Sequence, residues 1–188
     1  MENVIYKETS FSGQCIDMIP VTDSALTKIV ELRNQQRSQY FLNQSKELTY
    51  KDQKKWYDEY KKRDNDIYWV ITDKNGDVIG TNRLYDITDN QCEQGSLIID
   101  ENRAKEAPYL VEAMLLTLSF AFDQLKVNKV INEDRVDNKV MNSITKRIGF
   151  TYLKDVEIRG ATYRYYELTK ENYKRDMLAD LLNRWMER

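Results

Sequence analysis

The sequence predicts an α/β fold in which a mostly antiparallel β-sheet is flanked by helices. Three observations support this prediction. Strand-like and helix-like segments follow one another along the chain, an Asn-Gly pair at 75–76 separates two strand-like runs, and a long apolar helix at 107–125 connects two further runs. The Asn-Gly pair is typical of a β-hairpin turn. The strand–helix–strand order predicts one parallel, right-handed crossover.

The first third of the chain predicts one strand and two helices. The run "QCIDMIP" at 14–20 alternates like a strand. The segment 21–40 follows a Thr-Asp-Ser cap region, and four apolar residues recur in it at helical spacing: Leu26, Ile29, Val30 and Leu32. The segment 49–64 predicts the second helix, with Thr49 as its N-cap and Trp56 and Tyr60 one turn apart.

The rest of the chain predicts the remaining sheet and three more helices. Strands are expected at 67–73, 78–88, 93–100, 127–134, 150–158 and 162–169. Besides the long helix, one helix is expected at 137–149, where Gly149 fits a left-handed C-cap. A C-terminal helix at about 170–187 carries an apolar stripe of Met177, Leu178, Leu181, Leu182 and Trp185. That stripe must cover either the protein's own fold or a second subunit, so a homodimer contact is one expectation.

Length and composition limit the classes of function. The 188 residues suggest one domain over 1–188, with a core at about 14–168. The net charge is −2, which favours neither nucleic acid nor an anionic membrane as a partner. No His is present, so we expect no metal site and no Ser-His-Asp or Cys-His nucleophile. The first residues lack an apolar signal region, and we expect a cytoplasmic protein with Cys15 and Cys92 as free thiols.

Four motifs occur in the same order as in a known family. They are "LRNQQR" at 32–37, "GDVIGTNRLYDI" at 76–87, "EAMLLTLSFAFDQLKVNKV" at 112–130 and "DNKVMNSITKRIGF" at 137–150. With these motifs the chain resembles the GNAT N-acetyltransferases, and most closely the branch of Rim-type and sugar-amine enzymes. The resemblance implies acetyl-CoA as the acyl donor and direct attack by a primary amine, without a covalent enzyme intermediate.

The resemblance also implies the residues that hold the donor. The pantetheine arm would bind the backbone of Leu97, Ile98 and Ile99, and Asn138 would lie near the cofactor. The family's pyrophosphate loop has two small residues at the positions of Glu106 and Pro108 here. We expect the N–H groups of Ala107, Tyr109 and Leu110, with Arg103 and Lys105, to bind the pyrophosphate instead, and Pro108 to be the first helical residue. A domain that has lost acetyl-CoA is the alternative, and Asn138 also fits a helix N-cap.

Catalysis in this family needs a base for the acceptor ammonium and an acid for the departing thiolate. Glu93 matches a position where the family places a carboxylate or its water, and Asn132 lies at the end of the next strand. Many members have a Tyr as the acid, and here Thr145 occupies that position. Tyr166 is therefore a candidate for the role, as are the other tyrosines of the strands: Tyr85, Tyr163 and Tyr165.

The acceptor side is expected on the first helix. Arg33, Asn34 and Arg37 match the family's acceptor cleft, together with Tyr85. Arg33 and Arg37 are four residues apart and would share a helical face, which suits an anionic acceptor such as a nucleotide-linked amino sugar. A protein N-terminus or an antibiotic amine is an alternative acceptor. A non-catalytic GNAT-like binding module is the alternative from another class.

Overall fold

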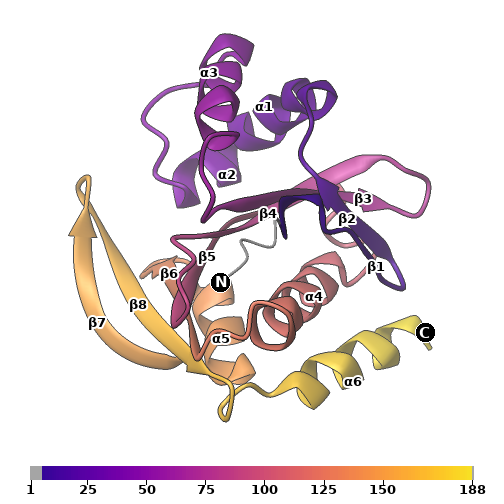
Figure 1. Cartoon of the computed structure of the whole chain (residues 1–188), viewed down its shortest axis with the longest axis vertical. Coiled ribbons are helices and arrows are strands. Elements are labelled where there is room, and N and C mark those ends of the chain that lie inside the picture. The colour runs from indigo at the N-terminus through magenta and orange to yellow at the C-terminus, as the bar shows by residue number, and fades with distance from the viewer. Residues whose placement is uncertain (1–5, 188) are drawn as a thin grey trace.

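A computed structural model describes residues 6–187, which form one eight-stranded sheet with helices on both of its faces (Figure 1). The strands are β1 (Phe11–Ser12), β2 (Ile16–Pro20), β3 (Ile67–Asp73), β4 (Val78–Tyr85), β5 (Gln91–Ile99), β6 (Lys129–Arg135), β7 (Thr151–Ile158) and β8 (Ala161–Thr169). Their order across the sheet is β1-β2-β3-β4-β5-β6-β8-β7. The pair β5/β6 is parallel and the other pairs are antiparallel, which confirms the predicted fold class.

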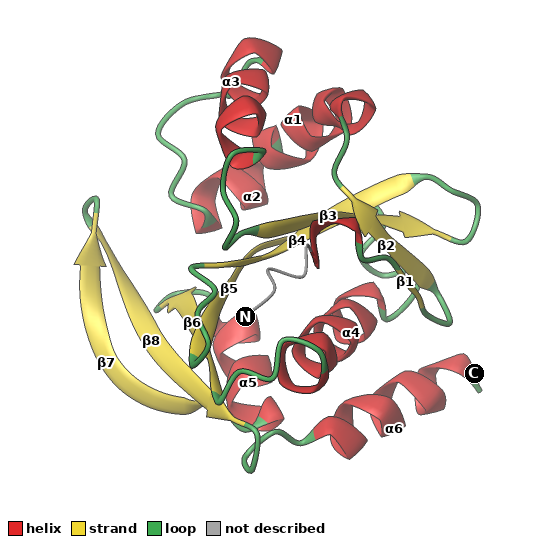
Figure 2. Ribbon diagram, in the orientation of Figure 1, coloured by secondary structure: helices red, strands yellow, loops and turns green. Residues whose placement is uncertain are grey.

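The helices divide between the two faces of the sheet (Figure 2). One face carries α1 (Leu26–Asn34), α2 (Gln36–Phe41) and α3 (Tyr50–Tyr60). The other carries α4 (Tyr109–Asp123), α5 (Lys139–Ile148) and α6 (Arg175–Met186). Short 3-10 helices lie at Tyr6–Glu8 and Asp23–Ala25. Among the described helices, none has the length and apolar character needed to cross a membrane.

Alternation along the strands explains the two layers. In β3, Trp69 and Ile71 belong to the apolar cluster on the α4 side, whereas Tyr68 and Val70 belong to the cluster on the α1 and α3 side. Successive side chains of a strand point to opposite faces of the sheet, so β3 contributes to both cores and is buried along its whole length. The sheet therefore separates two apolar cores. A site that contacts both faces of the sheet must lie where neighbouring strands separate.

Local sequence signals account for most helix and turn boundaries. Thr49 caps α3 through a capping box with Asp52. Gly149 ends α5 with φ of 116°, in the left-handed region that a C-cap requires. Gly76 has φ of 90° in the turn between β3 and β4. These three predictions are confirmed.

The prediction of one helix over 21–40 is wrong. A 3-10 turn precedes α1, and the chain leaves helical geometry at Gln35, with ψ of 140°, before α2 begins. The side chain of Gln35 donates to Asp100 Oδ1 at 2.8 Å and accepts from the Glu101 N–H at 3.2 Å. This contact with the loop after β5 fixes the break, and no local sequence signal marks it.

The C-terminal helix α6 packs on the layer that contains α4. Leu178 and Leu182 are 1% and 2% exposed and belong to the same apolar cluster as Ala113 and Leu118 of α4. Leu178 and Leu182 of the predicted stripe are thus covered by the chain itself, and Met177 is partly buried against the same cluster. Leu181 and Trp185 remain exposed at 42% and 37%.

Candidate active site

The sheet opens between β5 and β6. The two strands pair in parallel only from Gln91↔Lys129 to Gln94↔Asn132. Beyond that point β5 stays with β4, whereas β6 continues beside β8 to Arg135. Backbone groups on the free edge of β5 after Gln94 have no strand partner, and they are available to an extended ligand. The predicted donor-binding residues Leu97, Ile98 and Ile99 lie on this stretch.

A bulge in β5 marks the start of the opening. Thr81 pairs with Ile98 and Arg83 with Gly95, so β5 contains an extra residue between these two pairs. Ser96 has φ of 50° there, and its carbonyl accepts from the Thr81 hydroxyl at 2.7 Å. A bulge of this kind redirects backbone and side chains locally, and it places an irregular backbone segment where the strands diverge.

The loop between β5 and α4 is rich in charge that is already paired. Arg103 lies 2.8 Å from Asp73, 2.6 Å from Glu106 and 3.7 Å from Asp77. Binding a pyrophosphate would require Arg103 to exchange these carboxylates for phosphate oxygens. Lys105 is exposed. The structure therefore leaves Lys105 as the more available of the two predicted cations.

The N-terminus of α4 offers backbone donors. Pro108 is the N-cap and Tyr109 the first helical residue, so the prediction that Pro108 begins the helix is wrong by one residue. Pro108 provides no side-chain cap, and the first N–H groups of a helix have no partner within it. Those of Tyr109 and Leu110 accordingly face outward along the helix axis, where an anion is stabilised by about 0.3–1 kcal/mol per charge at exposed sites.

Glu112, in the first turn of α4, is bound to the start of β2. Its carboxylate is 2% exposed and accepts the backbone N–H groups of Gln14, Cys15 and Ile16. These hydrogen bonds fasten the start of β2 to α4.

Asn138 is the N-cap of α5, because its Oδ1 accepts the Met141 N–H at 3.3 Å. The residue is 9% exposed. The Oδ1 atom of Asn138 is used in the cap, whereas its Nδ2 takes no part in that hydrogen bond. The capping role is confirmed, while a contact with the donor stays a prediction.

A cluster of carboxylates and tyrosines lies at the opening on the side of α1 and α3. Glu93 is opposite Tyr85 of β4, and Glu133 is opposite Tyr165 of β8. Burial and the charge of Glu133 raise the pKa of Glu93 above its ordinary value. Burial and the neighbouring carboxylates raise the pKa values of Tyr85 and Tyr165, so both phenols stay protonated near neutral pH. The raised pKa makes Glu93 a candidate for proton exchange with a substrate.

Asn132 and Tyr166 lie on the other face of the sheet. Since Glu93 pairs with Ile131, its side chain and that of Asn132 point to opposite faces. Tyr166 is opposite Asn132 and is fully buried, and its hydroxyl donates to Asn142 Oδ1 of α5 at 2.7 Å. The structure does not bring the three predicted catalytic residues together. The roles of Asn132 and Tyr166 stay predictions.

Thr145 occupies the position of the family's acidic Tyr, and its hydroxyl is engaged. It donates to the buried carboxyl group of Asp134 at 2.6 Å. Burial raises the pKa of Asp134, and the bond from Thr145 partly opposes that rise. The Thr145 hydroxyl is fully buried and serves this pair.

A cavity of about 290 Å³ lies on the side of α1 and α3 and reaches the β5 bulge. It is lined by Arg33, Leu48, Asp52, Gln53, Trp56, Tyr68, Arg83 and Ser96. Arg83 is neutralised by Asp66, which accepts from its Nε at 2.7 Å. The Nε atom of Arg33 is buried and has no hydrogen-bond partner among the described residues. Arg33 therefore adds a positive charge to the lining of this cavity.

The other predicted acceptor residues are arranged differently. The premise that Arg33 and Arg37 share a helical face is wrong, because the helix breaks between them. Arg37 lies on α2 over the ring of Phe41, outside the cavity lining. Asn34 fastens the loop before α3, accepting from the Leu48 N–H and donating to the Leu48 carbonyl. Tyr85 covers Gly95 beside the bulge.

Neither cysteine has the properties of a nucleophile. Burial raises the pKa of Cys15 to about 12, with Glu112 adding to the shift. Burial likewise raises the pKa of Cys92 to about 12. Both remain thiols near neutral pH, and only a thiolate attacks efficiently. In the part of the chain from 6 to 187, no three His, Cys, Asp or Glu side chains are grouped as a metal site would require.

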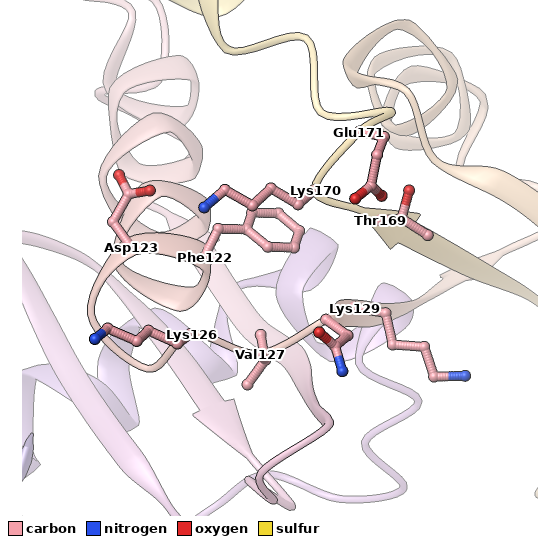
Figure 3. A pocket seen from close by; sticks show the side chains of 9 residues that line it. Phe122, Asp123, Lys126, Val127, Lys129, Thr169, Lys170 and Glu171 are labelled. Atoms are coloured by element: carbon pink, nitrogen blue, oxygen red, sulfur yellow. The ribbon is translucent and has the colours of Figure 1, made fainter.

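A larger hollow lies at the opposite end of the β5/β6 pair. It measures about 670 Å³ and lies between the end of α4, the start of β6 and the end of β8 (Figure 3). The side chains of Lys126 and Lys129 extend away from each other in Figure 3, and Lys129 is paired with Glu167 at 2.8 Å. These two cations therefore do not converge on one ligand.

Sequence reasoning missed Trp56 and Arg83, which line this cavity, and Asp66, which pairs with Arg83. Arg83 lies over the rings of Trp56 and Tyr85, at 5.1 and 4.5 Å from their centroids. A charged residue in the middle of the strand run "VIGTNRLY" is the signal that could have identified Arg83. Its partner Asp66 precedes β3 and has no sequence signature.

Comparison with known proteins identifies the family. The model of the acetyltransferase (GNAT) domain matches residues 16–151. The chain therefore belongs to the GNAT family and is an acetyl-CoA-dependent N-acetyltransferase. No match was found among curated proteins.

Solved structures share the fold. A GCN5-related N-acetyltransferase from Brucella melitensis has a TM-score of 0.76 and 18% identity, covering 95% of this chain and 86% of that one. The apo structure of FdhC, a nucleotide-linked sugar GNAT, has a TM-score of 0.77 and 24% identity, covering 93% and 97%. Spermidine N-acetyltransferase from Vibrio cholerae, in complex with CoA and spermine, has a TM-score of 0.75 and 14% identity, covering 84% and 97%.

Proposed function

We propose that this enzyme transfers an acyl group from acetyl-CoA to an amine that also carries an anionic group, such as a nucleotide-linked amino sugar. The single observation behind the anionic acceptor is Arg33. Its buried Nε has no hydrogen-bond partner among residues 6–187, and it lines the cavity that leads to the β5 bulge. A guanidinium in this setting pairs well with a phosphate or carboxylate.

The donor binds along the open edge of β5. The backbone of Leu97, Ile98 and Ile99 pairs with the pantetheine arm, as a peptide would add to a sheet edge. Its pyrophosphate lies at the N-terminus of α4, where Ala107, Tyr109 and Leu110 donate N–H groups and Lys105 adds charge. Asn138 contacts the donor from the start of α5. In this proposal Arg103 shapes the loop through its carboxylate partners and moves to phosphate only if they release it.

Proton transfer begins on the acceptor side. Glu93 takes a proton from the acceptor ammonium, directly or through water, and the free amine attacks the thioester carbon. The C–N bond forms and the C–S bond breaks, and the CoA thiolate leaves and is protonated. The raised pKa of Glu93 brings it nearer to neutral pH, where a general base is most effective. Tyr85 covers the bulge and bounds the path of the amine.

The branch of sugar-amine enzymes is favoured over other acceptor classes by two features. Arg33 provides charge for an anion, and the structural neighbour FdhC is described as a nucleotide-linked sugar GNAT. Glu93 and Glu133 provide negative charge near the reacting amine. The resulting polarity, anion at Arg33 and ammonium at Glu93, suits an acceptor with both charges.

Substitution of Arg33 tests the acceptor class. We expect Arg33→Ala to raise KM for a nucleotide-linked amino sugar about tenfold or more, because one charged hydrogen bond contributes about 1.5–3 kcal/mol. Arg37→Ala is the matched comparison and should change KM little, since Arg37 lies outside the cavity. Release of CoA thiol is the readout, with spermidine as the cationic acceptor. Equal KM values for wild type and Arg33→Ala, or a preference for spermidine, would contradict the anionic acceptor.

We also propose that the protein acts in the cytoplasm and forms a homodimer through α6. The two cysteines are free and buried, as expected for a reducing compartment. Leu181, Trp185 and Met186 expose 42%, 37% and 46% of their surface on α6, and apolar residues grouped in this way are common in subunit contacts.

A further inference from the structure

The cavity lined by Arg33 also contains a glutamine at a position where an apolar residue is expected. The buried residues of α3 are Gln53, Tyr57 and Tyr60, which follow the i, i+4 and i+7 spacing of one helical face. Tyr57 and Tyr60 belong to the apolar cluster on this side of the sheet, and Trp56 packs against it. Gln53 continues the same face and is 5% exposed, but it lines the cavity.

The side chain of Gln53 differs from its neighbour Asp52 in its hydrogen bonding. The carboxylate of Asp52 accepts from the N–H and the hydroxyl group of Thr49 at 3.0 and 2.9 Å. Among the described side chains, no hydrogen bond engages the amide of Gln53 in this way. A buried amide without a partner is unfavourable, and residues that break the local pattern of a fold are often functional.

The charges around the cavity are balanced except at Arg33. Arg83 is paired with Asp66 at 2.7 Å, and the carboxylate of Asp52 is engaged in the cap of α3. The Nε atom of Arg33 is buried without a hydrogen-bond partner within residues 6–187. The lining therefore carries a positive charge that the protein leaves available, and Gln53 adds neutral donors and an acceptor to the same lining.

Together the two side chains match one chemical class of ligand group. Phosphate or carboxylate oxygens accept from the guanidinium of Arg33 and from Nε2 of Gln53, while Oε1 of Gln53 accepts from a hydroxyl group of the same ligand. A cation would meet the charge of Arg33 without a free carboxylate to offset it. Ser96 of the β5 bulge lines the same cavity, so a ligand held there lies beside the opening of the sheet.

We propose that Gln53 determines the charge preference for the acceptor. Its Nε2 binds the same anionic group as Arg33, and its neutrality keeps the charge of Arg33 available to that group. This inference rests on the proposed function, which places the anionic part of the acceptor in this cavity. Gln53 takes no part in bond making, so it sets KM and the choice between acceptors, whereas kcat depends on other residues.

Two substitutions of Gln53 in the full chain test the two parts of this proposal, with UDP-glucosamine and spermidine as acceptors. Gln53→Met keeps the length of the side chain and removes the donor, so KM for UDP-glucosamine should rise about tenfold while kcat changes less than about twofold. Gln53→Glu places a carboxylate in the lining that contains Arg33. KM for UDP-glucosamine should then rise further than in Gln53→Met, and KM for spermidine should fall. Release of CoA thiol from acetyl-CoA is the readout.

Gln36→Glu is the matched control for the change of charge. Gln36 is exposed on α2 and lies outside the cavity lining, so both KM values should stay within about twofold of those of wild type. The melting temperature of each variant reports on the fold. A Gln53→Met protein with a lowered melting temperature and an unchanged KM would give Gln53 a structural role and overturn the proposal.

A double-variant cycle tests whether Gln53 and Arg33 bind the same group. If they do, Gln53→Met should raise KM for UDP-glucosamine much less in an Arg33→Ala background than in wild type, because the effects of residues that share a partner are not additive. Additive changes in KM would mean that the two side chains bind separate groups, and they would overturn the shared site.

The outcomes also separate this inference from the proposed function. If Arg33→Ala raises KM for UDP-glucosamine while both Gln53 variants leave it unchanged, the anionic acceptor stands and the role of Gln53 is refuted. If wild type prefers spermidine and Arg33→Ala has no effect, the anionic acceptor itself is refuted, and with it the inference that depends on it.

Discussion

Glu93→Gln is expected to lower kcat/KM for the amine acceptor by about 10²–10⁴-fold at pH 7, the range typical of a lost general base. The variant keeps the shape of the side chain and removes the ability to accept a proton. In wild type, activity should rise with pH as Glu93 ionises, which gives the pH–rate profile an acidic limb. Because the pKa of Glu93 is raised, this limb should lie at higher pH than an ordinary Glu would produce. The limb should be absent in the variant. Initial rates across pH with one acceptor measure both effects.

Glu133→Gln is the matched control for this experiment. The charge of Glu133 raises the pKa of Glu93, so its removal should move the acidic limb to lower pH while activity at pH 7 is retained. A Glu93→Gln enzyme with wild-type kcat/KM, or a limb that Glu133→Gln does not move, would exclude Glu93 as the base.

The contribution of Glu93 to stability should decline as pH rises, whereas activity should increase. A carboxyl group whose pKa is raised on folding binds more protons in the native state, so its contribution to stability declines as pH rises from the unfolded to the folded pKa. Glu93→Gln removes this decline. The melting temperature of the variant above that window should equal or exceed that of wild type, which separates loss of activity from loss of fold.

Asp66→Asn is expected to produce the largest loss of stability, about 3–5 kcal/mol, the range for breaking a buried ion pair. The side chain of Asp66 is 2% exposed and that of Arg83 is 15% exposed. Asp66 accepts from Arg83 through both carboxylate oxygens and from Arg63 at 3.0 Å. The variant leaves a largely buried guanidinium without a counter-charge. For a chain of this size the melting temperature should fall by roughly 6–20 °C.

A surface ion pair and a double variant complete that comparison. Asp58 pairs with Lys54 and Lys61 on the surface of α3, and Asp58→Asn should leave the melting temperature almost unchanged. Asp66→Leu combined with Arg83→Met should recover much of the stability, because it leaves no isolated buried charge. A loss below about 1 kcal/mol for Asp66→Asn would contradict the role given to this pair.

The elements that could be predicted from sequence are those with local causes. The Asn-Gly turn, the Thr49 cap and the Gly149 cap each depend on a few adjacent residues, and each is found where expected. The break at Gln35 has a distant cause, because that side chain bonds to Asp100 and Glu101. Tertiary contacts override local helix preference in such cases.

The candidate site could be predicted only in part, because side-chain faces depend on strand register. Glu93 and Asn132 both lie at the opening, but the pairing of Glu93 with Ile131 sends them to opposite faces. A shift of one residue would have placed them together. For the same reason the sequence named Glu93 as a candidate without revealing that Tyr85 and Glu133 lie beside it, because their proximity is set by pairing across β4, β5 and β6.

We propose that a loop without glycine, from Asp100 to Pro108, still binds the pyrophosphate of acetyl-CoA. Calorimetric titration of the purified protein with acetyl-CoA tests it most directly, with CoA and dephospho-CoA as comparisons. We predict binding in the micromolar range for acetyl-CoA and CoA, supported by the N-terminus of α4 and the open edge of β5. No binding up to millimolar concentration would contradict the claim, and a non-catalytic binding module would then become the better account.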